Sequence, residues 1–355
     1  MHIPRHTKTA LLLAALLLTF SHSCNNVLNG LLELQREMIP VTTDDELLEV
    51  IGEDGVIIGI MNDITLTNII HIDGGKNITI TAFERDVKLK MDTSRPLLEI
   101  ISVSSGTLNL GDRRGVGKLI LEGEAGRSAP LLKLDIGASV IMNDRVAIKD
   151  NSGSIYGCGV QIEGGTFTMN GGEISGNDSF IDGGGVYVRS GGEFNMAGGT
   201  IGVNEASNNG GGVSVSGGVF TMTGGTIKGN KAASGGGGGV YVTITGTFTM
   251  TGGTISGNQA SGGSNGGGGV YLDDGSFTMN SGTITQNTAG VSGGGVYVDN
   301  GSFTMNGGTI TGNTATISGG GVKVSGGIID GPGLSGVTGN YAPPETVNNF
   351  DPPYP

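Results

Sequence analysis

Short runs of alternating apolar and polar residues recur through the second half of this chain at intervals of 26 to 29 residues. One repeat contains a Val-Tyr-Val run at 240–242, a Phe-Thr-Met run at 248–250 and a Thr-Ile-Ser run at 254–256. Alternation with a period of two places the apolar side chains on one face of a β-strand. Glycine runs between these segments suit tight corners, because glycine tolerates positive φ angles. The pattern predicts a repeating unit of strands and corners.

The repeats align residue by residue. Coils stacked at the usual strand spacing of about 4.8 Å therefore bring the same residue type of neighbouring coils into contact. The aligned columns are Phe167, Phe194, Phe220, Phe248, Phe277 and Phe303; Ile174, Ile201, Ile227, Ile255, Ile284 and Ile310; and Asn177, Asn204, Asn230, Asn258, Asn287 and Asn313. A single coil cannot bury its apolar face, whereas a stack of coils can. The sequence therefore predicts an all-β fold, a single three-sided parallel β-helix with regular coils over residues 158–327.

Two segments of the repeat carry a family resemblance. At Gly184-Gly185-Val186-Tyr187 and Ile255-Ser256-Gly257-Asn258 the chain resembles the right-handed, pectate-lyase-like β-helix proteins. It is most similar to the repeats of polymorphic outer-membrane proteins and related adhesin-like proteins of bacteria. The resemblance implies right-handed coils and a bacterial surface protein with an adhesin-like or structural role. It also implies an alternative, a polysaccharide lyase or hydrolase, because many proteins of this fold are such enzymes.

The first 23 residues have the features of a secretory signal peptide. Arg5 and Lys8 precede an apolar run, Ala10 to Phe20, which at 11 residues is too short to span a bilayer. Cleavage before Cys24 would leave that cysteine at the new N-terminus, as in bacterial lipoproteins. We therefore expect an exported protein held to the membrane by lipid on Cys24, at the outer membrane or cell surface, with a soluble secreted protein as the alternative.

The rest of the chain divides into three parts. Residues 24–43 are predicted to be a tether, and Thr43-Asp44-Asp45-Glu46 is a capping-box pattern that predicts a short helix closing the first coil. The β-helix is predicted to span 44–330. Residues 331–355 contain two Pro-Pro pairs and are predicted to form a tail that cannot extend the strand ladders.

The charge of the chain restricts its partners. The formal net charge is −13, and no basic patch suited to nucleic acid is apparent along the regular coils. No histidine follows His71, and the acidic corner at Asp273-Asp274 is interpreted as solvated, with weak cation binding as an alternative, so the sequence predicts no cofactor and no metal site. We expect instead a host or matrix protein or a glycan as the partner.

The candidate binding residues lie on the Val-Tyr-Val strands. Tyr187, Tyr241, Tyr271 and Tyr297 occupy one outward position, which predicts an exposed row of rings able to stack on sugars or anchor a protein. Asp273 and Asp299 edge this row, one coil apart. Asp273 and the adjacent Asp274 form the only dense acidic group on the regular coils, with Asp299 one coil on. Short loops leave no walls for a cleft, so we expect binding without catalysis.

Overall fold

The computed structural model describes residues 37–262, 266–342 and 350–351. The chain divides into two compact units, residues 1–38 and 39–355, and nearly all of the described residues lie in the second. The strands of the described residues form three long parallel sheets, named A, B and C, and one short parallel sheet, named D. The expected signal peptide and Cys24 lie outside the described residues. No helix in the described ranges is both long and apolar enough to cross a bilayer.

Each sheet takes one strand from each successive coil. Sheet A contains β1 (Met38–Val41), β2 (Ile57–Ile60), β5 (Asn77–Ala82), β8 (Gly106–Leu110), β11 (Ala138–Met142), β14 (Thr166–Met169), β18 (Glu193–Met196), β22 (Val219–Met222), β26 (Thr247–Met250), β30 (Ser276–Met279), β34 (Ser302–Met305) and β38 (Ile328–Asp330). Sheet B contains β3 (Ile64–Leu66), β6 (Val87–Met91), β9 (Leu119–Glu122), β12 (Val146–Lys149), β15 (Glu173–Ser175), β19 (Thr200–Gly202), β23 (Thr226–Lys228), β27 (Thr254–Ser256), β31 (Thr283–Thr285), β35 (Thr309–Thr311) and β39 (Val337–Thr338).

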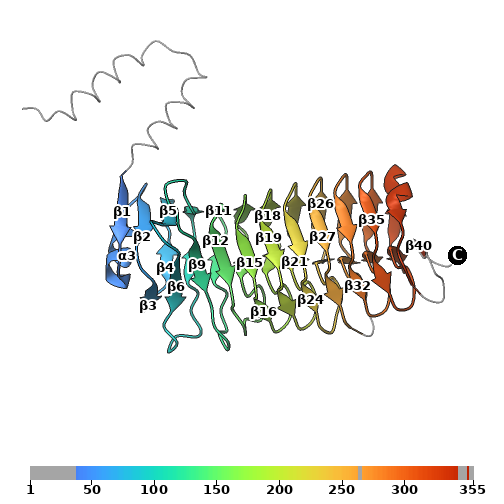
Figure 1. Cartoon of the computed structure of the whole chain (residues 1–355), viewed down its shortest axis with the longest axis horizontal. Helices are drawn as coiled ribbons and strands as arrows, with labels where there is room; N and C mark the ends of the chain where they lie inside the picture. Colours follow the sequence, from blue (N-terminus) through green and yellow to red (C-terminus); the bar gives the residue numbers. More distant parts are fainter. Residues whose placement is uncertain (1–36, 263–265, 343–349, 352–355) are drawn as a thin grey trace, which may run out of the picture. The chain divides into compact units, whose positions relative to one another are not determined.

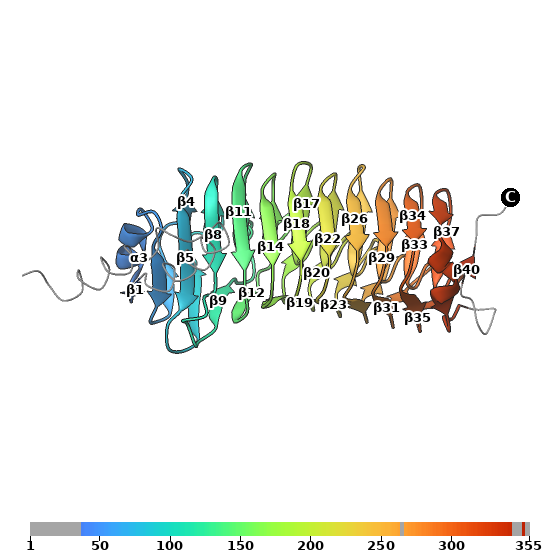
Figure 2. The ribbon, with the colours of Figure 1, turned by 90° about the horizontal axis from the view of Figure 1, so that it is seen from above.

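The other two sheets complete the coil. Sheet C contains β4 (Ile70–Ile72), β7 (Ile101–Val103), β10 (Leu132–Leu134), β13 (Val160–Ile162), β17 (Val186–Arg189), β21 (Val213–Ser216), β25 (Val240–Thr243), β29 (Val270–Asp273), β33 (Val296–Val298), β37 (Val322–Val324) and β40 (Phe350–Asp351). Sheet D contains the two-residue strands β16 (Asp178–Ser179), β20 (Glu205–Ala206), β24 (Lys231–Ala232), β28 (Gln259–Ala260), β32 (Thr288–Ala289) and β36 (Thr314–Ala315). In a regular coil the chain runs through sheets A, B, D and C in turn. Figures 1 and 2 show the coils stacked side by side from the blue to the red end.

The predicted apolar columns form the core. The register pairs Phe167 with Phe194 and each later Phe with the next, and neighbouring ring centroids lie 4.5 to 5.4 Å apart. These rings and the Met and Ile columns are at most 1% exposed. Residues of the same type therefore pack against one another in neighbouring coils. The predicted all-β parallel β-helix is confirmed.

The asparagine column forms a continuous ladder of hydrogen bonds inside the corner after sheet B. The side chain of Asn258, for example, donates to the Ile227 carbonyl at 3.0 Å and to Asn287 Oδ1 at 2.9 Å. Its own Oδ1 accepts from the backbone and side-chain nitrogens of Asn230. The sequence analysis missed two members of the column, Asn151 at its start and Asn340 at its end, which are likewise buried.

The ends of the β-helix differ in part from the prediction. The capping helix is present as α3 (Asp44–Val50), with both bonds of the capping box between Thr43 and Glu46. The predicted tether is wrong at its end, because Met38–Val41 form strand β1. The predicted tail is also wrong, because Val337–Thr338 extend sheet B and Asn340 extends the ladder. The first proline of this segment lies at the start of a short 3₁₀ helix, η1 (Pro332–Gly336), and the chain rejoins sheet B directly after it.

Candidate functional site

The predicted tyrosine row lies on sheet C. Tyr241, Tyr271 and Tyr297 pair in register on consecutive strands, and their ring centroids are 5.3 Å apart at both steps. This agrees with the expected spacing of roughly 5 Å. Ser214 interrupts the row between Tyr187 and Tyr241. On the other side of Tyr187, the ring of Tyr156 stacks at 4.7 Å, a contact that the sequence analysis missed because Tyr156 lies outside the repeat motif.

The acidic residues at the edge of the row bind the tyrosine hydroxyls. Tyr241 Oη donates to Asp273 Oδ2 at 2.9 Å, and Tyr271 Oη donates to Asp299 Oδ2 at 3.4 Å. Each tyrosine therefore contacts the aspartate of the following coil. Burial raises the pKa of Tyr241 and of Tyr271, and the neighbouring carboxylates raise both further. Both phenols stay protonated at neutral pH and act as hydrogen-bond donors.

The prediction that these rings are exposed is wrong for three of the four. Tyr187, Tyr241 and Tyr271 are 7%, 6% and 3% exposed, and only Tyr297 is half-buried. The glycine-rich loop before β25 covers Tyr271 of the following coil. A Cβ atom added to Gly236, for example, would lie 2.6 Å from Tyr271 Cδ1. The row is therefore mostly packed against backbone, and its role in binding a partner stays a prediction.

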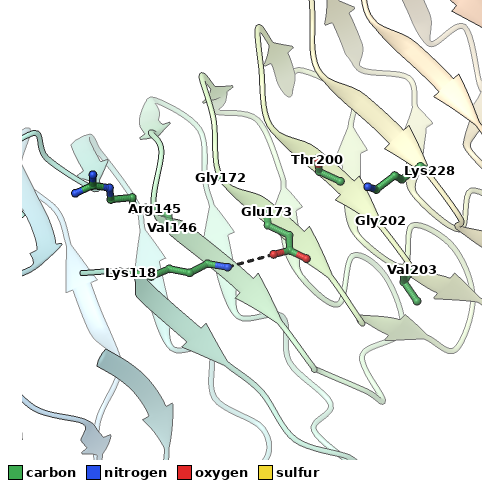
Figure 3. Close-up of a pocket in the computed structure, with 9 residues that line it drawn as sticks. All are labelled: Lys118, Arg145, Val146, Gly172, Glu173, Thr200, Gly202, Val203 and Lys228. Carbon is green, nitrogen blue, oxygen red and sulfur yellow. Dashed lines mark hydrogen bonds and ion pairs between the residues drawn. The ribbon is translucent and has the colours of Figure 1, made fainter. Parts of the chain in front are cut away.

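A second feature is a groove across the outer face of sheet B, with a volume of about 500 Å³. Its lining comes from five successive coils and consists of Lys118, Arg145, Val146, Gly172, Glu173, Thr200, Gly202, Val203 and Lys228. Figure 3 shows Lys118 and Glu173 pointing toward one another, with Val203 and Lys228 on the coils beyond. Five coils span roughly 19 Å at the usual strand spacing. The groove can therefore hold a segment of an extended molecule.

The groove carries excess positive charge. Its lining holds three cations and one carboxylate, Glu173, a net charge of +2 in a chain whose net charge is −13. Lys118 Nζ lies 3.2 Å from Glu173 Oε2. Arg145 donates to the carbonyl oxygens of Gly115 and Val116, both at 3.1 Å, and no carboxylate within ion-pair distance of Arg145 or Lys228 is recorded in the described part of the chain.

The pKa of Glu173 is held below its usual value. The largest cause is a hydrogen bond from the Ser175 side chain, and Lys118 lowers the pKa further, although partial burial opposes both. The carboxyl group is therefore ionised at neutral pH and can only accept hydrogen bonds.

Two glycines form the floor of the groove for different reasons. Gly172 has φ +79°, and its Cβ would lie 2.6 Å from the Val146 carbonyl oxygen, so the backbone requires glycine there. Gly202 does not have a positive φ, but a Cβ there would make tight contacts of 3.3 Å with the Lys228 carbonyl oxygen and with Thr200 Cγ2. The corresponding positions on other coils hold Ser175, Lys228 and Ser256. The coil that contains Gly202 therefore has no side chain at this position, and this leaves the floor of the groove open.

The sequence analysis missed this groove. The signal in the sequence was Gly202, which lies in an outward column that holds Ser, Lys and Thr on the other regular coils. The groove also contains Lys118 and Lys228, which lie 110 residues apart in the chain. Lys118 and Arg145 come from the irregular coils, whose alignment with the regular ones is not visible in the repeat motif.

Two further groups bear on chemistry. Cys158 is fully buried, and burial raises the pKa of its thiol to about 11, so it is a packing residue in the first regular coil. Among residues 37–262, 266–342 and 350–351 there is no group of three or more His, Cys, Asp or Glu side chains placed to hold a metal ion.

Comparison with known proteins yields one match. Residues 158–328 match the family model described as a right handed beta helix region. No curated protein and no solved structure matches the chain. The matched span begins at Cys158, where the regular coils begin, and ends in β38. The match covers just under half of the chain, and together with the stacked parallel sheets it supports a right-handed parallel β-helix repeat architecture.

Proposed function

We propose that this protein is a non-catalytic, exported scaffold whose rigid β-helix binds a protein or glycan partner at the bacterial surface. The observation that carries the proposal is the unbroken repetition of the coils. From Phe167 to Phe303 every coil repeats the same buried columns, and the asparagine ladder fixes each corner to the next. A stack of this kind holds its outward residues in a fixed array.

The environment of the acidic residues supports binding without catalysis. Glycoside cleavage needs two carboxyl groups facing one substrate, one of them able to donate a proton. Asp273 and Asp299 instead accept hydrogen bonds from tyrosines of the preceding coils. They stabilise the sheet C face and are not directed together toward one open site. The proposed lipid on Cys24 would hold the rod at the membrane.

The test combines attachment and cleavage. The purified chain should be retained on a panel of immobilised matrix proteins and glycans, and should release no products from polygalacturonate or neutral glycans, with or without calcium. Labelling of intact cells with a membrane-impermeant reagent should modify the protein. Cleavage that is lost in Asp273→Asn or Asp299→Asn would instead establish the lyase or hydrolase alternative.

The tyrosine row has its own test. The triple variant of Tyr241, Tyr271 and Tyr297 to Phe keeps ring packing and removes the hydroxyls, whereas Tyr297→Ser removes the one half-buried ring. Loss of attachment in Tyr297→Ser, with a folded protein, would place the contact on this row. Attachment equal to that of the parent in both variants would leave the row with a packing role only.

A further inference from the structure

We propose that the corner between sheets D and C at the start of the regular coils is a docking site for a basic protein segment, one that presents an apolar side chain between lysines or arginines. This inference rests on the proposed binding function and names the class of partner and the place where it binds. Exposed apolar side chains at this corner supply the anchor, and the carboxylates beside them set the preferred charge of the partner.

Three apolar residues on two neighbouring coils form the anchor, and we call them the apolar corner: Ile155, Phe180 and Ile181. The side chains of Phe180 and Ile155 are 63% and 52% exposed, and Ile181 is half-buried. The Phe180 backbone N–H donates to the Ser154 carbonyl at 2.9 Å, and the Ile181 N–H donates to the Ile155 carbonyl at 3.0 Å. The three residues are therefore adjacent. Contiguous exposed apolar residues mark interaction surfaces, whereas single ones do not.

The fold does not require a large apolar side chain at position 180. Phe180 directly follows β16, and none of the residues that directly follow the later strands of sheet D is large and apolar. These residues are Ser207, Ala233, Ser261, Gly290 and Thr316. Phe180 also lies outside the core column of phenylalanines, whose rings are at most 1% exposed. Packing within the chain does not account for this ring, and an exposed aromatic ring is suited to anchoring a protein partner.

The charge beside the apolar corner is negative. Asp178 and Phe180 are two residues apart in an extended run, so their side chains lie on the same face. Asp178 is exposed and pairs in register with Glu205 of the next coil, and Asp182 directly follows the apolar corner. Lys231 lies 2.6 Å from Glu205, so one cation faces three carboxylates, a net charge of −2. The ion pairs recorded for the described residues include neither Asp178 nor Asp182.

The surroundings of these carboxylates disfavour their charged forms. Burial raises the pKa of Asp178, and the negative charge of Glu205 raises it further. Burial also raises the pKa of Asp182, although two hydrogen bonds from Asn209 oppose this. A cation from a partner would stabilise the charged form of both groups. The corner therefore favours a partner that carries positive charge next to its apolar side chain.

Other occupants fit this surface less well. A second copy of the chain in a two-fold contact would bring the same acidic residues together, and like charges across an interface repel. Nucleic acid and anionic membranes carry negative charge and would be repelled in the same way. A basic segment of another protein meets both the apolar and the electrostatic requirement.

The experiment selects binders of the immobilised full chain from a library of random heptapeptides displayed on phage. The enriched sequences should combine at least one aromatic or branched apolar residue with two or more lysines or arginines. A peptide of the enriched consensus should bind at least about tenfold more weakly to Phe180→Ser, which removes the anchor. The double variant Asp178→Asn, Glu205→Gln should weaken binding by a similar factor, and the parent's binding should weaken at high salt. Phe180→Ser should fold, because Ser207 occupies the same position on the next coil.

Matched controls lie on the same corner of a later coil and on other faces. Ile317 is 58% exposed at the position equivalent to Ile181, but the outward residues of sheet D there are Thr288 and Thr314. Ile317→Ser therefore removes an equally exposed apolar side chain that has no acidic neighbours in sheet D. The double variant Asp274→Asn, Glu193→Gln removes two exposed charges from other faces. Both controls should bind the peptide within about twofold of the parent.

Several results would overturn the inference. Equal binding of the peptide by Phe180→Ser and the parent would do so, and so would enriched sequences that lack basic residues, an equal loss of binding in the controls, or a selection that enriches no sequence. These outcomes leave the scaffold proposal standing if the chain still attaches to immobilised matrix proteins or glycans. Cleavage of a glycan by the purified chain would refute the scaffold proposal instead.

Discussion

Replacing one rung of the asparagine ladder tests how the regular coils are held together. In Asn258→Ala the chain loses two hydrogen bonds that the side chain donates, to Ile227 O and Asn287 Oδ1. It also loses two that Asn258 Oδ1 accepts from Asn230, one from the backbone N–H and one from the side chain. Asn287 Oδ1 keeps its bond from the Asn258 backbone at 2.9 Å.

The magnitude follows from these contacts. The Asn230 backbone N–H is buried and loses the bond that satisfies it, at a cost of about 1 to 3 kcal/mol. The other three bonds contribute about 0.5 to 1.5 kcal/mol each. The expected loss is therefore roughly 3 to 7 kcal/mol of local stability. Asn306→Ala is the matched control, because its side-chain bond to Asn280 Oδ1 is exposed and its loss should cost about 0.5 kcal/mol or less.

Native-state hydrogen exchange is the suitable assay, because a repeat protein need not unfold in a single step. The amide of Asn230 should exchange at least about 100-fold faster in Asn258→Ala, since each 1.4 kcal/mol is a factor of ten. Coils far from Asn258 should keep their protection. A change below about tenfold at Asn230, or an equal effect in Asn306→Ala, would refute the assignment of stability to the ladder.

Four other perturbations have defined outcomes. Phe248→Ala removes a ring that is 1% exposed and should cost about 3 to 5 kcal/mol near its own coil, seen as exchange protection lost there and retained elsewhere. Val203→Gly relieves the positive φ and should stabilise the chain by about 1 kcal/mol in thermal unfolding, with an unchanged midpoint arguing against strain. Burial raises the pKa of Asp182 despite two hydrogen bonds from Asn209. The stability that protonated Asp182 contributes is therefore present at low pH and lost as pH rises through the folded-state pKa. Asp182→Asn should raise the urea midpoint at pH 7 but not near about pH 3, and an equal gain at both would contradict the burial argument. Cys24→Ala should release the protein from membranes in cell fractionation, whereas a parent protein found wholly in the soluble fraction would reject lipidation.

The core of this fold was predictable because the repeat makes each buried column visible many times. Phe, Met, Ile and Asn recur at fixed positions, and stacking them leaves few other arrangements. Sheet D was missed because strands of two residues, such as Gln259–Ala260, carry no periodicity. The end of the stack was missed because the proline content of the last segment hid Val337–Thr338.

The surface was less predictable than the core. The alternation of apolar and polar residues correctly predicted that the ring of Tyr271 lies on the outward side of its strand. It cannot predict which loop covers that side. The cover comes from the loop around Gly236, in another coil. The groove likewise depends on Lys118 and Lys228, which lie far apart in the sequence. They come to the same face only through the register of four successive strand pairings.

The asparagine ladder also gives the stack an electrical direction. Each side-chain amide from Asn177 to Asn313 donates to the next asparagine toward the C-terminus. Aligned amide dipoles add, as they do in a helix, and each bond polarises the next. The first rung, Asn151, leaves its Oδ1 buried without a hydrogen-bond partner in the described chain. In the preceding coil the register places Glu124, not an asparagine, opposite Asn151, so the column begins at Asn151. A regular coil duplicated between Asn151 and Asn340 would therefore place its asparagine between a donor on one side and an acceptor on the other, so the ladder can lengthen without leaving a new unpaired amide.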